Sequence, residues 1–278
     1  MTPSEPTFQA TAKATSAPND QATASSPSTT RVVGMEIARV DYTEALDRID
    51  AMVATKTKGY ICVAPVHLVM LAEERPDLRS AIDKASFTVP DGMPLVWAMR
   101  CLGHGHQSRV YGPELMARAC ERAARSGTRM YLYGGRNEGA LVQLTLNLRR
   151  RYPGLRIVGG WSPPFRPLTA EEESTVIADI NRSEADIVWV GTGQPKQELW
   201  MAQMRPHLQA PVMVGVGAAF DFHAGIVAQA PHWMQVCGLE WTYRVYREPR
   251  RLWRRYLRYN PRFVAGFARQ YAQHRRGR

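Results

Sequence analysis

The chain has 278 residues, 45% of them hydrophobic, so it is long enough to bury a large core in one domain or two. Its formal net charge of +11 resides in residues 244–278, which hold twelve arginines and one acidic residue, whereas the preceding sequence is electrically neutral. There is no run of roughly 18 to 20 apolar residues, no secretory signal pattern and no paired cysteine spacing, so we expect a cytoplasmic protein with reduced thiols that neither spans a membrane nor is secreted.

Residues 1–30 are rich in Ser, Thr, Ala and Pro and are predicted to be disordered. From Arg31 to about residue 230, apolar runs typical of strands alternate with segments of helical apolar spacing. A strand or hairpin is expected over 31–40, and further strands over 59–66, 86–92, 129–135, 155–161, 186–193 and 212–222. Helices are expected over 42–56, 93–100, 112–127, 137–154, 169–183 and 195–205. This alternation predicts an α/β body over 31–230, a Rossmann-like, mostly parallel sheet with helices on both faces.

Residues 231–278 are aromatic and basic, and Pro231, Pro249 and Pro261 interrupt them. We expect two or three short helices here, forming an appendage to the α/β body. A basic segment of this kind favours a polyanionic partner, which could be a nucleic acid, an anionic membrane surface or a phosphorylated substrate.

Several turns after the predicted strands carry residues suited to ligand binding, because ligands of open α/β sheets bind beyond the carboxyl ends of the strands. Glycines in such turns let backbone N–H groups approach a phosphate, although purely structural turn glycines remain an alternative. The candidates are Gly92, Gly134, Gly135, Gly191, Gly193, Lys196 and Gly217. Neither the dinucleotide-binding GxGxxG spacing nor a P-loop is present, which argues against a Rossmann oxidoreductase.

Two acidic residues stand at strand ends. Asp91 is either a general base at the mouth of a cleft or the N-cap of the following helix. Asp221, between two phenylalanines, is either a buried hydrogen-bonding acid or a substrate contact. The chain has no Asp-x-Asp triplet, and the pair His104 and His106 lacks a third ligand, so no metal or other cofactor is predicted.

The segments PDGMPLVW, VGTGQPKQELW, GVGAAFDFHAG and APHWMQVCGLEWTYRVYREPRRLWRRY resemble the WecG/TagA/CpsF family of glycosyltransferases. PDGMPLVWAMR and SRVYGPELM are most similar to its GumM-type branch, which adds glucose to a lipid-linked glucose. The resemblance implies an inverting hexose transfer, with glucose favoured, from a UDP-sugar to an undecaprenyl-diphosphate-linked sugar in exopolysaccharide biosynthesis. It also leaves open N-acetylmannosamine or its uronate as the sugar, as in the synthesis of wall polymers or of enterobacterial antigen.

The same resemblance assigns catalytic roles to Asp91, as the base, and to Gln197. It further implies that Arg244, Arg247 or Arg251 contacts a diphosphate. One departure concerns residues 63–66, where Val-Ala-Pro-Val replaces the polar Thr and Asn common in the family. His67 is a candidate to replace one of those polar contacts.

Five arginines recur at steps of three and four residues, as on one face of a helix: Arg244, Arg247, Arg251, Arg254 and Arg258. Together with Trp253 and Tyr256 they favour peripheral binding to the anionic inner face of the cytoplasmic membrane. The alternative from another class, a nucleic-acid-binding protein that uses the basic tail, lacks any RRM, KH, zinc or helix-turn-helix signature. The oligomeric state, including a homo-oligomer, is left open.

Overall fold

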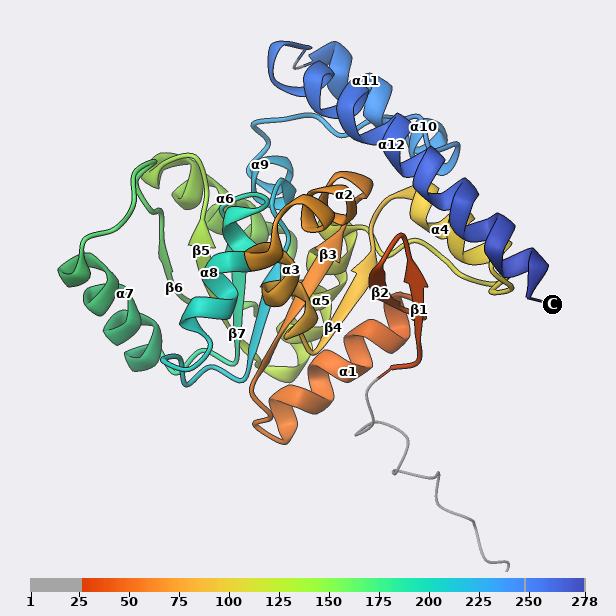
Figure 1. Ribbon diagram of the computed structural model, residues 1–278. Helices are drawn as coiled ribbons and strands as arrows, with labels where there is room; N and C mark the ends of the chain where they lie inside the picture. The colour runs from red at the N-terminus through yellow and green to blue at the C-terminus, as the bar shows by residue number, and fades with distance from the viewer. Residues whose placement is uncertain (1–26, 248, 278) are drawn as a thin grey trace, which may run out of the picture.

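The computed structural model describes residues 27–247 and 249–277, so most of the segment expected to be disordered lies outside it. Six parallel strands form the central sheet in the order β4-β3-β8-β7-β5-β6 (Figure 1). The strands are β3 (Gly59–Ala64), β4 (Phe87–Pro90), β5 (Arg129–Gly134), β6 (Arg156–Trp161), β7 (Ile187–Gly191) and β8 (Val212–Gly215). The predicted α/β class and the mostly parallel sheet are therefore confirmed.

Nine helices of the described body surround this sheet and a small hairpin. They are α1 (Tyr42–Ala54), α2 (Val66–Glu74), α3 (Pro76–Asp83), α4 (Met93–Cys101), α5 (Gly112–Ser126), α6 (Glu138–Arg151), α7 (Ala170–Arg182), α8 (Lys196–Met204) and α9 (Ala219–His223). Thr169 opens α7 with a capping box, in which its side chain accepts a hydrogen bond from the backbone of Glu172. Helices α2 and α3 occupy a stretch to which the sequence pattern assigned no element.

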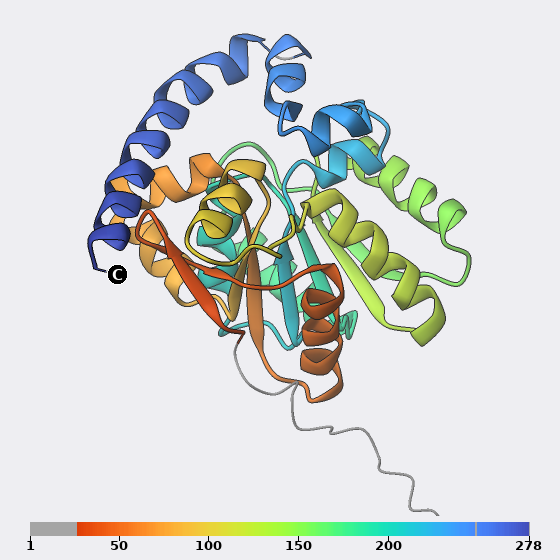
Figure 2. The ribbon, with the colours of Figure 1, turned by 90° about the vertical axis from the view of Figure 1, so that its right-hand side faces the viewer.

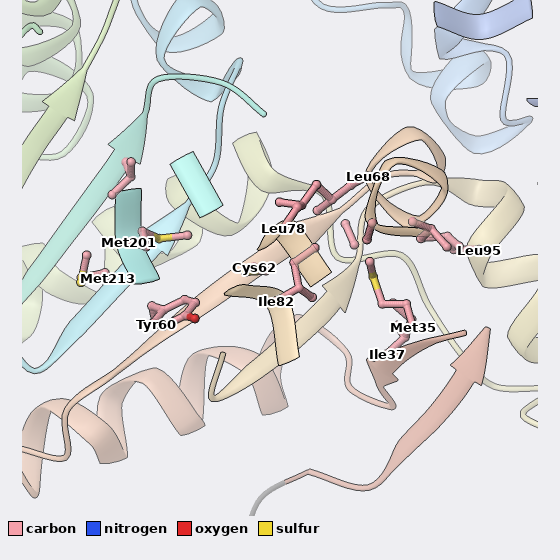
Figure 3. Packing of buried hydrophobic residues seen from close by; sticks show 14 of the residues in the cluster. Met35, Ile37, Tyr60, Cys62, Leu68, Leu78, Ile82, Leu95, Met201 and Met213 are labelled. Atoms are coloured by element: carbon pink, nitrogen blue, oxygen red, sulfur yellow. The ribbon is translucent and has the colours of Figure 1, made fainter. Parts of the chain in front are cut away.

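Two hydrophobic clusters lie on opposite faces of the sheet because successive strand side chains alternate between its faces. Tyr60 and Cys62 of β3 belong to the cluster shown in Figure 3, which α2, α3, α4, α7 and α8 cover. Ile61 and Val63 belong to the second cluster, which α1, α5, α6 and α9 cover. Burial on both faces explains why the strands read as nearly continuous apolar runs.

A short antiparallel hairpin, β1 (Thr29–Val32) and β2 (Met35–Ala38), precedes the main sheet. It fulfils the expectation of a strand or hairpin near the start of the body. Its first strand begins at Thr29, so the expected boundary at residues 30 and 31 falls inside the strand.

The strand predicted over 212–222 is shorter than expected. It ends at Gly215, and the short helix α9 begins at Ala219. Between them, Gly217 has a φ of +53° and turns the chain away from the sheet. Asp221 therefore lies on a helix beyond the strand, rather than at the end of the strand itself.

The appendage consists of α10 (His232–Val236), α11 (Glu240–Arg247) and α12 (Pro249–Arg276). The expectation of short helices was wrong for α12, which has 28 residues and contains Pro261. An interior proline costs a helix roughly 3 kcal/mol, but the buried side chains of Tyr259 and Phe263 pack with the core on either side of it. Packing against the body thus overrides the local helix-breaking signal.

Figure 2 shows α12 running around the body from the top of the sheet toward the β1–β2 hairpin. Near its middle, Arg258 Nη2 lies 3.0 Å from Glu74 Oε2 on α2, and Arg262 also pairs with Glu74. Near its end, the Gln270 side chain donates to the Arg31 carbonyl at 2.6 Å and accepts from the Val33 amide at 2.8 Å. These contacts anchor α12 to the body at two separated points.

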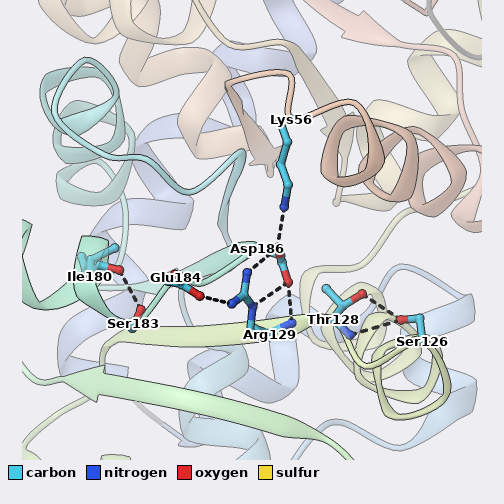
Figure 4. A network of polar contacts seen from close by, with 8 residues as sticks. All are labelled: Lys56, Ser126, Thr128, Arg129, Ile180, Ser183, Glu184 and Asp186. Atoms are coloured by element: carbon cyan, nitrogen blue, oxygen red, sulfur yellow. Dashed lines mark hydrogen bonds and ion pairs between the residues drawn. The ribbon is translucent and has the colours of Figure 1, made fainter.

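A polar network ties together the edge of the sheet at which strands β5 and β7 begin (Figure 4). The Asp186 carboxylate accepts hydrogen bonds from the Arg129 amide and from Lys56 Nζ, both at 2.9 Å. Burial acts to raise the pKa of Asp186, but the hydrogen bonds from Arg129 and Lys56 outweigh it and hold that pKa below its usual range.

The turn after β5 depends on Gly134, whose φ is +136°. A Cβ at this position would lie 2.6 Å from the Gly191 carbonyl carbon of β7. We therefore expect Gly134→Ala to lower the free energy of unfolding by about 2 to 4 kcal/mol in urea denaturation, because it combines backbone strain with a steric clash.

Gly105 provides the matched control, because a Cβ there meets no atom within 4 Å. Gly105→Ala should change the free energy of unfolding by less than about 0.5 kcal/mol. Equal effects of the two substitutions would contradict the assigned packing of β5 against β7.

Candidate active site

A cavity of about 550 Å³ opens at the edge of the sheet where the parallel strands end. Its walls come from the turns that follow β3, β4, β5, β7 and β8, and from α11 and α12 of the appendage. The cavity brings together most of the site residues expected from the sequence: Asp91, Gly92, Gly135, Gly191, Gly193, Gln197, Gly217, Asp221 and Arg244.

Three of the expected residues, Gly134, Lys196 and Arg247, are not among the described residues that line the cavity. Gly134 packs against the backbone of Gly191 and so shapes the turn rather than the cavity surface. Lys196 is exposed at the first position of α8, and Arg247 is exposed at the end of α11. Arg251 lies in α12, but its side chain falls outside the described part of the structure.

Asp91 follows β4 directly, and its amide donates to the Ala64 carbonyl of β3 at 3.0 Å. The N-cap of α4 is Gly92, without any side-chain capping bond, so Asp91 is not the helix cap that the sequence left open. Its Oδ1 lies 3.3 Å from Arg109 Nη2. Burial raises the pKa of Asp91 and outweighs the opposing effect of the Arg109 charge. A carboxylate with this environment is a stronger base than one in water.

Gln197 lies in the first turn of α8 and is almost fully buried. Its Nε2 donates to Glu198 Oε1 at 2.9 Å, whereas its Oε1 has no hydrogen-bond partner among the described residues. Gly217 leaves the space beside this oxygen open, since a Cβ there would lie 3.3 Å from it. An unsatisfied buried acceptor at a cavity wall is suited to receive a hydroxyl or N–H of a ligand.

Glu198 is also buried, and burial raises its pKa to about 7 despite the hydrogen bond from Gln197. The neighbouring Gln194 turns its Nε2 toward β3 and donates to the Val63 carbonyl at 2.7 Å. These contacts fix the loop between β7 and α8 against the centre of the sheet.

Among the described side chains, four arginines line the cavity: Arg109, Arg136, Arg244 and Arg255. Arg136 forms a bidentate pair with Asp221, with Nε–Oδ1 and Nη2–Oδ2 distances of 3.0 and 3.1 Å. Asp221 is therefore an ion-paired, half-buried acid at the cavity wall. A cluster of guanidinium groups beside glycine turns is suited to hold a diphosphate.

The cavity lining also contains residues that were not predicted from the sequence: Arg109, Arg136, Arg255 and Glu240. The signal for Arg136 was available, because it follows the glycine pair of the turn after β5. No local pattern marks Arg109, which lies in a loop 18 residues after Asp91, its partner. Glu240 meets Arg109 across 131 residues of sequence, a separation that no motif reports.

The Val-Ala-Pro-Val stretch presents Val63, Pro65 and Val66 to the cavity as apolar wall. His67 follows on the first turn of α2 and also lines the cavity, with no hydrogen-bond partner for its Nε2 among the described residues. Burial holds the pKa of His67 well below its usual range, and the charges of Arg255 and Arg244 act in the same direction. This imidazole is therefore neutral at physiological pH.

A half-buried carboxylate, a buried amide and a cluster of guanidinium groups at the carboxyl edge of a parallel sheet suit an enzyme that transfers a group from a phosphorylated donor. Comparison with known proteins narrows this class to the glycosyltransferases. The chain belongs to the WecG/TagA/CpsF family of glycosyl transferases, whose family model matches residues 30–277. The match extends through the hairpin, the α/β body and the appendage.

The family acts in general on a nucleotide-sugar donor and a lipid-linked acceptor. None of the helices in the described residues is both long and apolar enough to cross a membrane. Within the same residues, no group of three or more His, Cys, Asp or Glu side chains is arranged to hold a metal ion.

Because Glu198 is buried, we expect the free energy of unfolding to depend on pH. Its pKa rises from 4.5 to about 7 on folding, so its contribution to stability is complete below pH 4.5 and is lost as the pH rises through about 7. Relative to Glu198→Gln, we expect the wild type to lose about 3 kcal/mol of unfolding free energy between those pH values. Urea denaturation at a series of pH values measures the difference.

The exposed Glu121 offers a control, since Glu121→Gln removes a surface carboxylate on α5. A difference between wild type and Glu198→Gln that stays constant from pH 4.5 to 8 would show that Glu198 ionises normally.

Proposed function

We propose that this enzyme transfers a hexose, with glucose as the favoured sugar, from a UDP-sugar to an undecaprenyl-diphosphate-linked sugar, with inversion at the anomeric carbon. The reaction would serve exopolysaccharide biosynthesis at the cytoplasmic face of the membrane. The observation that carries the proposal is the position of Asp91, a half-buried carboxylate of raised pKa on the wall of an arginine-lined cavity. Membership of the family supports the use of a nucleotide sugar and a lipid-linked acceptor.

In this mechanism Asp91 accepts the proton of the acceptor hydroxyl as its oxygen attacks the anomeric carbon. The bond from that carbon to the diphosphate oxygen breaks on the opposite side, and UDP leaves with the electron pair. Arg136, Arg244 and Arg255 supply positive charge against the negative charge that develops on the leaving diphosphate. Gln197 presents its side-chain oxygen to a donor group of the substrate.

A donor screen tests the proposal and separates the candidate sugars. UDP-glucose, UDP-N-acetylglucosamine, UDP-N-acetylmannosamine and its uronate are each offered with a synthetic polyprenyl-diphosphate-linked sugar. Turnover with UDP-glucose and an inverted product linkage, identified by NMR, is the expected result. Preference for UDP-N-acetylmannosamine would instead favour the synthesis of a wall polymer, and retention of configuration would exclude Asp91 as the base of a single displacement.

Asp91→Asn is expected to lower kcat by about 10²- to 10⁴-fold, because it removes positioned proton transfer while preserving side-chain shape. UDP binding, measured by calorimetry, should remain within about threefold of wild type, because the cavity arginines are retained. Asp47→Asn on the exposed face of α1 is the control for a lost carboxylate. Near-normal turnover by Asp91→Asn would remove this residue from the mechanism.

Transfer is expected to proceed without a divalent metal, because the guanidinium groups of the cavity can neutralise the leaving diphosphate. Initial rates in excess EDTA should match those in magnesium-containing buffer. Loss of activity in EDTA that magnesium or manganese restores would contradict this expectation.

The exposed face of the appendage supports an anionic membrane surface as a further partner. Trp253, Leu257 and Val264 are exposed along one face of α12, and Tyr246 is exposed on α11. Arg250 and Arg254 are exposed beside them. Apolar side chains combined with arginines suit binding at the interface of anionic lipids.

The double substitution Trp253→Ser with Leu257→Ser is expected to weaken binding to phosphatidylglycerol vesicles by roughly tenfold or more, because it removes interfacial apolar area. The same pair of changes at Val142 and Leu146, exposed with the same spacing on α6, provides the control. Vesicle flotation measures both, and equal binding by the two variants would show that this face is not the membrane contact. Removal of the whole appendage is a less direct test, because Tyr259 and Phe263 belong to the core.

A further inference from the structure

One acidic side chain of the appendage is buried against the body. Residues 231–278 contain only two acidic residues, Glu240 and Glu248, among many arginines. Glu240 is the first residue of α11, and its side chain is 11% exposed. Its Oε2 accepts a hydrogen bond from Arg109 Nη2 at 2.7 Å, so this contact joins the appendage to the loop before α5.

Arg109 is shared between this acid and Asp91. The same Nη2 that lies 2.7 Å from Glu240 lies 3.3 Å from Asp91 Oδ1, and Nε donates to the Asp91 backbone carbonyl. The guanidinium also lies over the Tyr111 ring, 4.1 Å from its centroid, which restricts its movement. The shorter contact is typical of a charge-assisted hydrogen bond, whereas the contact with Asp91 is at the outer limit for one.

The groups that face Asp91 come from several elements. Arg109 and Tyr111 approach from the segment before α5, Tyr42 approaches from α1, and α11 contributes Glu240 and Arg244. Burial raises the pKa of Asp91, Arg109 lowers it, Glu240 raises it, and Arg244 lowers it. Glu240 therefore raises the pKa of Asp91, whereas Arg109, the arginine that Glu240 holds, lowers it.

We propose that Glu240 is a positioning residue for Asp91: it holds Arg109 in a shared geometry, which keeps the guanidinium from closing onto the Asp91 carboxylate. This inference rests on the proposed function, because it takes Asp91 as the base. Without Glu240, Arg109 would pair with Asp91 alone, and a fully paired carboxylate is a poorer proton acceptor. The seating of the appendage thereby sets the strength of the base.

Glu240→Gln tests this role, because it preserves shape and removes the charge. With the full-length chain and the donor and acceptor selected by the screen, the acid limb of the pH profile of kcat/KM should move down by about one pH unit. The plateau rate should fall at the same time, since the base is weaker. Glu240→Asp, which keeps the charge, should restore the limb toward its wild-type position.

Glu74→Gln is the matched control, because Glu74 also pairs with arginines across the boundary of body and appendage and is not among the charged groups that act on Asp91. It should leave the acid limb in place, whatever its effect on thermal stability. Arg109→Gln should move the limb in the opposite direction, to higher pH, because it removes the cation that lowers the pKa of Asp91. Circular dichroism and thermal melting confirm that each variant is folded.

A substrate-free measurement separates this inference from the proposed function. Proteins carrying ¹³C-labelled Asp carboxyl groups are titrated by NMR, and Asp91→Asn assigns the signal. Glu240→Gln is expected to lower the titration midpoint of Asp91 by about one pH unit. An unchanged midpoint would overturn the role of Glu240, even if Asp91→Asn abolishes turnover. A shifted midpoint with a wild-type acid limb would leave the coupling established and would reject Asp91 as the base.

Discussion

All six strands of the central sheet run in the same direction, and this constraint determines where the site lies. Parallel strands place all their carboxyl ends at one edge, so segments that are far apart in sequence open onto the same cavity. The contact of Gly134 with the Gly191 backbone then brings two of these turns as close as their main chains permit. At the opposite edge, the ion pairs of Asp186 with Lys56 and Arg129 hold together the starts of β5 and β7.

The appendage converts this edge from an open groove into a cavity with its own wall. It contributes Arg244 and Arg255 to the lining and places Glu240 against Arg109. Two further anchors, at Glu74 and at Gln270, involve residues that do not line the cavity, whereas Glu240 both holds the appendage and faces the cavity.

The sequence predicted the sheet, the order of its elements and much of the cavity, because apolar periodicity and strand-end glycines are local signals. Asp91 was singled out because it stands at the end of a predicted strand, and Gln197 because the segment that holds it resembles the family. Arg109 and Glu240 were not predicted, because only their contact with each other marks them as site residues. That contact joins positions 131 residues apart in the sequence. The length of α12 was also predicted wrongly. Local rules end a helix at Pro261, but buried side chains on either side of this proline pack in the core and keep α12 continuous.

The hydrogen bonds that Gln270 donates to Arg31 and accepts from Val33 join the two ends of the described chain. During synthesis the α/β body leaves the ribosome before α12 does. The nascent enzyme therefore has Asp91 and the glycine turns before it has the part of the cavity wall that the appendage supplies. Domains generally fold as they emerge during synthesis. The order of translation thus delays assembly of the complete site until the last helix is available.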